Sequence, residues 1–236
     1  MTELLYLTDC YLKEFEATVV DVGELGIALD RTAFFPGGGG QVADKGVIFW
    51  EGAEYPLKGL KKQGETVWHK VDGPFPPKGA KVKGVLDWEH RYQMMRTHTA
   101  FHILCGVIWR DYGALVTGGD MKPLQGRMDF ELEHMSADFA QEVERKINAE
   151  VEAAHPVKVY VLPREEAFKI PDLIRTKINL LPESIRQVRV VEIEGLDIQA
   201  DGGTHVANTG EVGRIRVVGH ESKGKINKRI RIALEP

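Results

Sequence analysis

Two pairs of potential metal ligands, far apart in the chain, place the strongest constraint on how it folds. His98 and His102 lie in the segment Arg-Thr-His-Thr-Ala-Phe-His, and Asp201 and His205 lie in Asp-Gly-Gly-Thr-His. In a helix, residues i and i+4 share one face, so both imidazoles of the first pair can reach one ion. The two glycines of the second segment allow a tight turn that brings a carboxylate and an imidazole back toward one point. The sequence therefore predicts that a helix and a turn meet at one metal site.

Zinc is the metal that this set of side chains suggests. In proteins it is commonly held by three side chains, with one position open for water or substrate. We therefore predict one Zn²⁺ ion, bound by His98, His102, His205 and Asp201. Either half alone is also typical of an ordinary structure, because a His-x-x-x-His pair occurs by chance on helices and an aspartate often caps a glycine turn.

The order of the motifs resembles a known family of editing domains. His98-x-x-x-His102, followed by Gly-Gly-Thr-His205-Val-x-Asn-Thr-Gly-Glu211, is similar to the editing domain shared by alanyl-tRNA and threonyl-tRNA synthetases. The segment from Thr32 to Gln41, Thr-Ala-Phe-Phe-Pro-Gly-Gly-Gly-Gly-Gln, resembles the glycine-rich motif that precedes the editing core in the alanyl branch.

Further segments resemble the same branch. They are Asp87-Trp-Glu with Arg91, Arg127-Met-Asp-Phe130, and the basic segment from Ser222 to Arg231. The resemblance spans nearly the whole chain in the expected order. It is the pattern of the stand-alone alanyl-tRNA editing proteins of the AlaX family, in the form that carries the glycine-rich domain but no synthetase body.

The resemblance implies a trans-editing hydrolase. Its substrate would be tRNA(Ala) mischarged with serine, and also with glycine, and its reaction the zinc-dependent hydrolysis of the aminoacyl ester. The roles of His98, His102 and His205 carry over directly. The family's second motif usually begins with cysteine, and Asp201 stands at that place, so its role as a ligand stays open. Cys105 does not simply replace it, because a free cysteine on a helix is usually buried packing.

The attacking group is expected to be a metal-bound water, or a water attacking a substrate that the metal holds, and the sequence leaves both open. Thr97, Gln125 and Thr204 are the candidate polar groups of the cleft. No glutamate follows His98 as in the His-Glu-x-x-His motif, which disfavours a metalloprotease. A pocket that hydrogen-bonds the serine hydroxyl would reject alanine. Thr117, expected in a loop near Gly118, is a candidate reader of that hydroxyl.

The expected RNA surface is local, because the formal net charge of the chain is only -4. Basic residues gather between Lys223 and Arg231, and Lys58, Lys61 and Lys62 are expected in a polar loop. The glycine run lacks the lysine and hydroxyl residue of a P-loop, so no nucleoside triphosphate is expected to bind. The predicted substrate-binding residues are Gly37, Gly38, Gly39, Gly40, Gln41, Thr117, Arg127, Lys225, Lys228 and Arg229.

The periodicity predicts an α+β fold with two domains. Residues 1–86 alternate in short segments typical of a small β-barrel-like domain, which carries the glycine-rich motif. Residues 87–236 are expected to form the editing domain, with helices packed on an antiparallel sheet. The predicted helices cover 89–112 and 137–154, the latter capped by Ser136. The predicted strands cover 16–22, 26–30, 82–87, 157–162, 187–193, 212–218 and 229–234.

The composition predicts a cytoplasmic protein. Two cysteines are too few for a disulfide framework, and no segment resembles a signal peptide or a membrane span. Two other functions remain open on the sequence alone. One is threonyl-type editing or another zinc hydrolase, and the other is a noncatalytic tRNA-binding module that retains a structural zinc.

Overall fold

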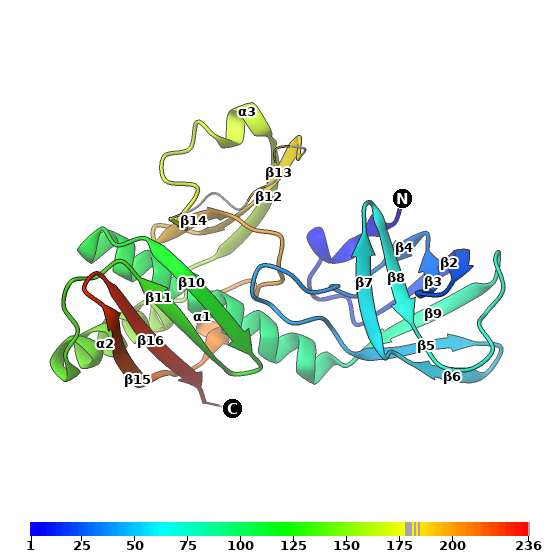
Figure 1. The fold of residues 1–236 in the computed structure, drawn as a ribbon, viewed down its shortest axis with the longest axis horizontal. Coiled ribbons are helices and arrows are strands. Elements are labelled where there is room, and N and C mark those ends of the chain that lie inside the picture. Colours follow the sequence, from blue (N-terminus) through cyan, green and yellow to red (C-terminus); the bar gives the residue numbers. More distant parts are fainter. Residues whose placement is uncertain (178–180, 182, 184, 236) are drawn as a thin grey trace. The chain divides into compact units, whose positions relative to one another are not determined.

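The computed structural model describes residues 1–177, 181, 183 and 185–235, and Figure 1 shows it as a ribbon. The chain forms two compact units, Met1–Gln93 and Met94–Pro236. The boundary lies inside the helix α1 (Trp88–Tyr112). Each unit is built mostly from antiparallel sheets, so the α+β class predicted from the sequence is confirmed.

The first unit is dominated by a seven-stranded antiparallel sheet with the order β6-β5-β9-β2-β3-β8-β7. Its strands are β2 (Glu14–Gly23), β3 (Gly26–Leu29), β5 (Gly46–Trp50), β6 (Ala53–Pro56), β7 (Gly59–Gln63), β8 (Thr66–Lys70) and β9 (Lys81–Leu86). Two short strands, β1 (Glu3–Leu4) and β4 (Arg31–Thr32), pair in parallel, and the 3-10 helix η1 (Leu5–Leu7) follows β1. Fully buried Ile27, Leu29, Phe34 and Ile48 lie in its core.

The strand order differs from one sequence expectation. β6 and β7 are the edges of the sheet, and no pairing joins them in the part of the chain that the structure describes. The predicted small barrel is therefore not confirmed. The polar loop predicted around Lys61 and Lys62 is wrong, because both residues lie in β7, where they pair with β8. Lys58 precedes this strand and forms an ion pair with Asp72.

The four glycines of the glycine-rich motif form a tight turn. Gly38 and Gln41 exchange two backbone hydrogen bonds of 3.0 Å. The φ angles of Gly37, Gly38, Gly39 and Gly40 are 86°, 140°, 59° and 87°. Side chains disfavour this region of φ, so the turn explains why glycine occupies all four positions.

A buried ion pair holds the residues on both sides of this turn. The side chains of Arg91 and Asp44 are 0% and 1% exposed. Arg91 Nε donates to Asp44 Oδ1 and Oδ2 at 3.0 and 3.1 Å, and Arg91 Nη1 donates to Cys10 O at 2.9 Å. Asp44 Oδ2 also accepts from Phe35 N at 2.6 Å. The first turn of α1 thus fixes the chain that enters and leaves the glycine run.

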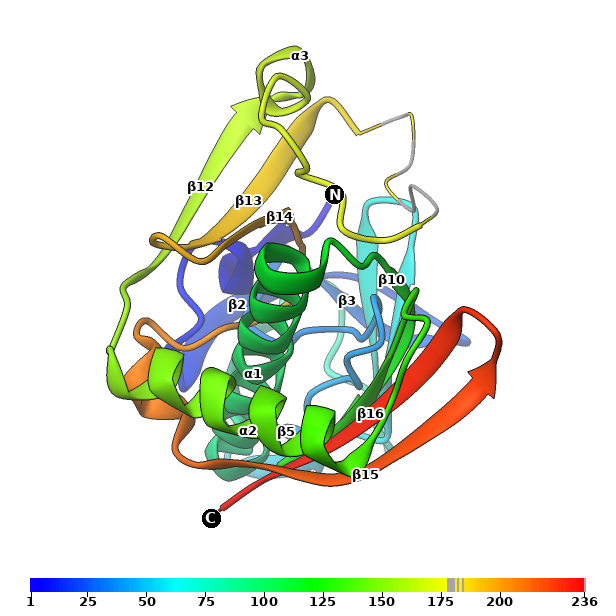
Figure 2. The same cartoon turned by 90° about the vertical axis from the view of Figure 1, so that its left-hand side faces the viewer.

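The second unit contains α1 from Met94 onward, α2 (Ala137–Glu152) and two antiparallel sheets. The larger sheet has the order β10-β11-β16-β15, with β10 (Val116–Lys122), β11 (Gln125–Phe130), β15 (Ile215–Gly224) and β16 (Asn227–Leu234). The smaller sheet has the order β12-β13-β14, with β12 (Val157–Pro163), β13 (Gln187–Ile193), β14 (Asp197–Ala200) and the short helix α3 (Arg164–Ala167) after β12. Figure 2 shows α1 and α2 on one side of the larger sheet.

Apolar residues cover most of α1 from Met94 onward, and this explains its central place in the second unit. Ala100, Ile103, Leu104 and Val107 are fully buried, in addition to the stripe that the periodicity predicts. A helix that is apolar on most sides is stable only inside a core. The Phe101 ring reaches the larger sheet at Gly126, where an added Cβ would lie 2.5 Å from the ring. Glycine at this position therefore lets α1 approach β11 closely.

Most predicted elements of the second unit are confirmed. The predicted helix at 89–112 is α1, and Ser136 caps α2 by accepting a hydrogen bond from Phe139 N at 3.1 Å. The predicted last four strands correspond to β12, β13, β15 and β16. The β10–β11 hairpin was not predicted, so the loop expected around Thr117 is wrong, because Thr117 lies in β10. No helix among the described residues has both the length and the apolar character needed to cross a membrane.

Candidate metal centre

The first half of the centre lies on α1. His98 and His102 are buried, with 5% and 3% exposure, on one face of the helix. Their rings are 5.3 Å apart between centroids. The neighbouring threonines bind two other segments to the helix. Thr97 Oγ1 accepts from Leu124 N at 2.9 Å, and Thr99 Oγ1 accepts from Val206 N at 3.2 Å. The helix thus fixes both the imidazoles and the segments that lie beside them.

The second half lies in the segment that follows β14. Asp201 Oδ1 accepts from Gly203 N at 2.6 Å, which closes the turn through the carboxylate. Arg189 in β13 exchanges two hydrogen bonds with the Asp201 backbone, at 3.1 and 2.9 Å. Gly202 does not adopt a left-handed φ, so the turn depends on the aspartate rather than on a special glycine conformation. His205 then follows, buried at 3% exposure.

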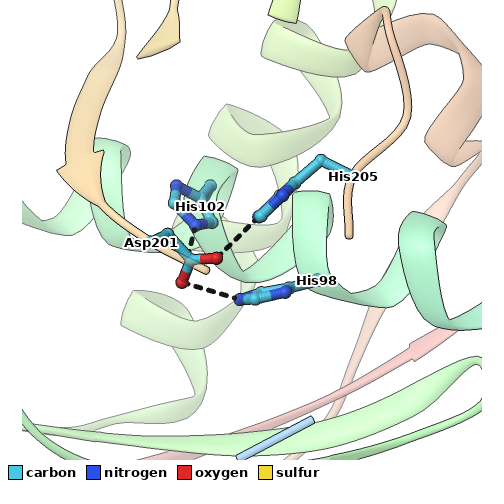
Figure 3. A group of neighbouring side chains, drawn as sticks. All are labelled: His98, His102, Asp201 and His205. Carbon is cyan, nitrogen blue, oxygen red and sulfur yellow. Dashed lines mark ion pairs between the residues drawn. The ribbon is translucent and has the colours of Figure 1, made fainter. Parts of the chain in front are cut away.

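The two halves converge on one point, as Figure 3 shows. One ligand atom from each of His98, His102, Asp201 and His205 lies within 4.8 Å of all the others. The distances from the Asp201 carboxylate oxygens to the Nε2 atoms of His98, His102 and His205 are 3.4, 3.9 and 3.7 Å. Four ligands around a tetrahedral zinc are about 3.3 Å apart, given bonds of about 2.0 to 2.1 Å. The cluster therefore has nearly the dimensions that a zinc ion requires.

The centre favours positive charge. Burial lowers the pKa of His102, but hydrogen bonds and charges from Asp197 and Asp201 outweigh burial and raise it to about 9. Burial raises the pKa of Asp201, but the charge of His98 and the hydrogen bonds of His102 and His98 hold it well below its usual value. Two carboxylates in a buried place thus stabilise a cation between the imidazoles.

His205 has the opposite tendency, and this also fits a metal ligand. Burial, followed by the charge of His98, lowers its pKa well below the usual value. Within the described residues, neither ring nitrogen of His205 has a hydrogen-bond partner. A buried polar group without a partner is costly, and a neutral imidazole is the form that binds zinc. Coordination would satisfy one of the two ring nitrogens of His205.

Asp197 contacts His102 on the ring nitrogen that points away from Asp201. Its side chain is 0% exposed, and its Oδ2 lies 2.9 Å from His102 Nδ1. Gln199 Nε2 donates to the same oxygen at 2.7 Å, and Arg175 Nε donates to Oδ1 at 3.4 Å. Arg175 in turn stacks over Trp109, 4.8 Å from the ring centroid. A carboxylate on the second nitrogen of a histidine fixes its ring, so Nε2 of His102 would be free to bind a metal ion.

Sequence reasoning missed Asp197, Gln199 and Arg175. The sequence does contain a signal for the first two, because Asp197, Gln199 and Asp201 occupy every second position. Alternate residues of a strand lie on one face. Since β14 ends one residue before Asp201, this spacing predicts that Asp197 and Gln199 lie on the same side as Asp201. Arg175 comes from a segment with no recognisable pattern.

The other residues predicted for the cleft lie in different surroundings. Thr97 and Thr204 are fully buried, whereas Gln125 is exposed at the start of β11. Cys105 is buried outside the ligand group, and burial, with the nearby charge of Asp197, raises the pKa of its thiol. The catalytic roles of Thr97, Gln125 and Thr204 stay predictions.

The predicted substrate-binding residues of the second unit lie on or beside the larger sheet. Thr117 Oγ1 donates to Asn227 Oδ1 at 2.9 Å. Lys228 is buried, and its Nζ donates to Gly224 O and Lys225 O at 2.6 and 3.0 Å. Arg229 binds Asp129 through two hydrogen bonds of 2.7 and 2.8 Å. Lys228 and Arg229 thus have structural partners, while Lys225 is exposed in the turn between β15 and β16.

Comparison with known proteins agrees with the motifs. Residues 188–231 match the family described as threonyl and alanyl tRNA synthetase second additional domain, and residues 4–90 match class II (A) tRNA synthetases. An alanyl-tRNA editing protein AlaX-M from Saccharolobus solfataricus is 43% identical over 240 residues, which cover 100% of both chains. The AlaX-M protein of Methanosarcina barkeri is 40% identical over 241 residues, which cover 99% of each chain.

A longer relative places the same region inside a synthetase. The alanine–tRNA ligase of Thermofilum pendens is 41% identical over 225 residues, which cover 93% of this chain and 24% of the ligase. The family that the sequence motifs indicated is therefore confirmed. Since relatives that are 40–43% identical match along the full length, this chain belongs to the AlaX-M family of alanyl-tRNA editing proteins.

Proposed function

We propose that this protein hydrolyses the ester of tRNA(Ala) that carries serine or glycine in place of alanine. The observation that carries the proposal is the convergence of three buried histidines, His98, His102 and His205, with the partly buried Asp201 in a chain of the AlaX-M family. The names of the relatives support alanyl-tRNA editing. The identity of the amino acid and of the metal belongs to the proposal.

Zinc is the proposed cofactor, with the three histidines and Asp201 as its ligands. The donor set of imidazoles and one carboxylate suits zinc. When bound, zinc supplies a positive charge that acidifies water or polarises an ester carbonyl. Asp197 keeps the His102 ring in place through Nδ1, and Asp201 is positioned by its bonds to Gly203 and Arg189. The residues of this chain would thus hold the ion through ligands whose side chains are themselves fixed by hydrogen bonds.

The need for such a reaction follows from the size of the amino acids. Serine differs from alanine by one hydroxyl, and glycine lacks one methyl group, so binding alone discriminates poorly and a second site must remove the errors. A group that hydrogen-bonds the serine hydroxyl would lose its partner when alanine is bound. Thr117 remains the candidate for this group.

A deacylation assay with seryl-, glycyl- and alanyl-tRNA(Ala) tests the proposal. We expect seryl-tRNA(Ala) to be cleaved fastest, glycyl-tRNA(Ala) more slowly and alanyl-tRNA(Ala) hardly at all, with activity lost in a chelator and restored by zinc. Seryl-tRNA(Thr) serves as the control substrate. Faster cleavage of seryl-tRNA(Thr) would show threonyl-type editing, and tRNA binding without any cleavage would show a noncatalytic module.

Metal content provides a separate test. Elemental analysis should find one zinc per chain in the wild-type protein and a large loss in the His98→Ala, His102→Ala double variant. Full metal occupancy in that variant would overturn the assignment of the ligands.

A further inference from the structure

We propose that a basic groove on the outer face of the larger sheet binds the phosphate backbone of the tRNA substrate. The groove has a volume of about 210 Å³ and is lined by Asp120, Lys122, Gln125, Gly126, Arg127, Val218, Arg231 and Ile232. The choice of tRNA as the partner rests on the proposed function, whereas the position and the charge of the groove come from the sheet itself.

Strand register places the charged residues of the groove on one face. Arg127 lies opposite Arg231 and beside Asp120 across the strands β10, β11 and β16. Directly opposed residues of neighbouring strands project to the same side, with Cβ atoms about 4.5 to 5.5 Å apart. Like charges at directly opposed positions are unfavourable in a sheet. A bound anion would remove this repulsion.

The carboxylates nearby neutralise the groove only in part. Arg127 binds Asp129 at 3.1 Å, and Arg231 binds Glu221 at 3.1 Å. Both carboxylates are shared with Arg229, which reaches Asp129 at 2.7 Å and Glu221 at 3.2 Å. Three guanidinium groups therefore share two carboxylates, and positive charge is left on the groove.

Lys122 adds to this excess. It is exposed at the end of β10, and no carboxylate pairs with its ammonium in the described part of the chain. Asp120 is the only acidic residue among those that line the groove. Since Lys122, Arg127 and Arg231 face one small hollow, they can surround a phosphate group, and the planar guanidinium suits paired contacts with its oxygens.

A second groove in the same unit is larger but is not basic, so the positive charge of the groove on the sheet does not follow from its size. That groove, along α2, has a volume of about 380 Å³, and its charged residues are Glu144, Glu152, Arg145 and Arg214. It is larger, but its positive and negative charges balance. An RNA backbone would therefore be attracted to the groove on the sheet rather than to the larger groove on α2.

The position of the basic groove also fits a substrate that must reach the metal centre. The hairpin that carries Lys122 and Gln125 turns at Leu124, whose backbone N–H is bound by Thr97 Oγ1. Thr97 directly precedes the ligand His98 on α1. The end of the hairpin is thus tied to the helix that supplies two ligands.

Binding of uncharged tRNA(Ala) at several salt concentrations tests the proposal. We expect the Lys122→Gln, Arg231→Gln double variant to bind about tenfold more weakly at low salt. The slope of log affinity against log salt should become shallower by about 1 per lost phosphate contact. The matched control is the Arg145→Gln, Arg214→Gln variant of the larger groove, for which neither quantity should change. The Lys122→Arg variant should retain binding because it retains the charge.

The contrary results are equally specific. The proposal is overturned if the double variant, with wild-type thermal unfolding, keeps the affinity and the salt slope of the wild type. It is also overturned if the control variant loses as much affinity as the test variant. This assay requires neither metal nor hydrolysis, so a protein that binds through the groove without deacylating tRNA contradicts the proposed function alone.

Discussion

The buried ion pair of Arg91 and Asp44 allows us to predict how much stability the first unit loses when the pair is broken. In Asp44→Ala, the guanidinium of Arg91 stays buried without a carboxylate, and Phe35 N loses its acceptor. Removing one partner of a buried ion pair costs about 3 to 5 kcal/mol. The exposure of 0% and 1% places this pair at the buried limit, so we expect a loss within that range.

Thermal unfolding measures this loss. For a chain of this size, 1 kcal/mol corresponds to a change in Tm of about 2 to 4 °C, so Asp44→Ala should lower the Tm by about 6 to 20 °C. Glu14→Ala is the matched control in the same unit, because Glu14 pairs with Lys83 at 2.8 Å while the two side chains are 62% and 46% exposed. An exposed pair of this kind contributes about 0 to 1 kcal/mol.

A double variant separates charge from packing. Arg91→Met with Asp44→Leu removes both charges and leaves apolar side chains, so it should recover much of the Tm that Asp44→Ala loses. If Asp44→Ala lowered the Tm no more than Glu14→Ala does, the burial argument would be wrong. A double variant that is less stable than Asp44→Ala would show that the hydrogen bonds of Arg91 to Cys10 O and other backbone carbonyls dominate instead.

Three further predictions concern the centre and the core. In competition with a chelator, Asp197→Ala should weaken zinc binding by about 10- to 100-fold, because His102 loses the hydrogen bond that holds its ring. Asp172 is an exposed carboxylate near Arg175, so Asp172→Ala should leave zinc binding unchanged. Asp201→Ala should weaken zinc binding and Asp201→Cys should retain or tighten it, since thiolate suits zinc better; unchanged affinity in Asp201→Ala would exclude Asp201 as a ligand. His69 is buried, and burial, against a hydrogen bond to the Ile27 backbone, lowers its pKa to about 4. The unfolded chain gains a proton on this residue below about pH 6.5 and the folded chain only below about pH 4, so stability falls as the pH decreases between these values, by about 3 kcal/mol at most. Urea unfolding of the wild type and His69→Gln should show a steeper pH dependence in the wild type, and equal slopes would contradict this assignment.

The cluster of His98, His102, Asp201 and His205 could be predicted from the sequence because each half is local. The spacing of His98 and His102 determines their common face on a helix, and Asp201 and His205 lie in one short turn. The helix α1 was predictable for a related reason, since its apolar period continues for many turns. The contacts of Asp197 depend instead on the meeting of β14 with α1, and only its alternation with Gln199 and Asp201 points toward the site.

The β10–β11 hairpin shows where local reasoning fails. Its strands contain Gly118, Gly119, Asp120 and Gly126, which have low preference for strands. Tertiary contacts compensate, because β11 pairs along its whole length with β16 and Gly126 accommodates the ring of Phe101. The sequence alone therefore indicates a loop around Thr117, although the folded chain forms a strand.

The basic C-terminal run shows that a cluster in sequence need not be a cluster in space. On a strand, neighbouring residues project to opposite faces, so Lys228 turns inward while Arg229 and Arg231 project outward. Lys228 then binds the carbonyls of its own hairpin turn, and Arg229 binds two carboxylates. In the proposed groove, the charge that would meet RNA comes from Arg231 together with Lys122 and Arg127, and the last two lie far from Arg231 in the sequence. Replacing Lys228 should therefore lower the free energy of unfolding, whereas replacing Lys122 should lower tRNA affinity. Measuring both quantities for both variants tests whether tRNA binds the basic C-terminal run or the groove on the sheet.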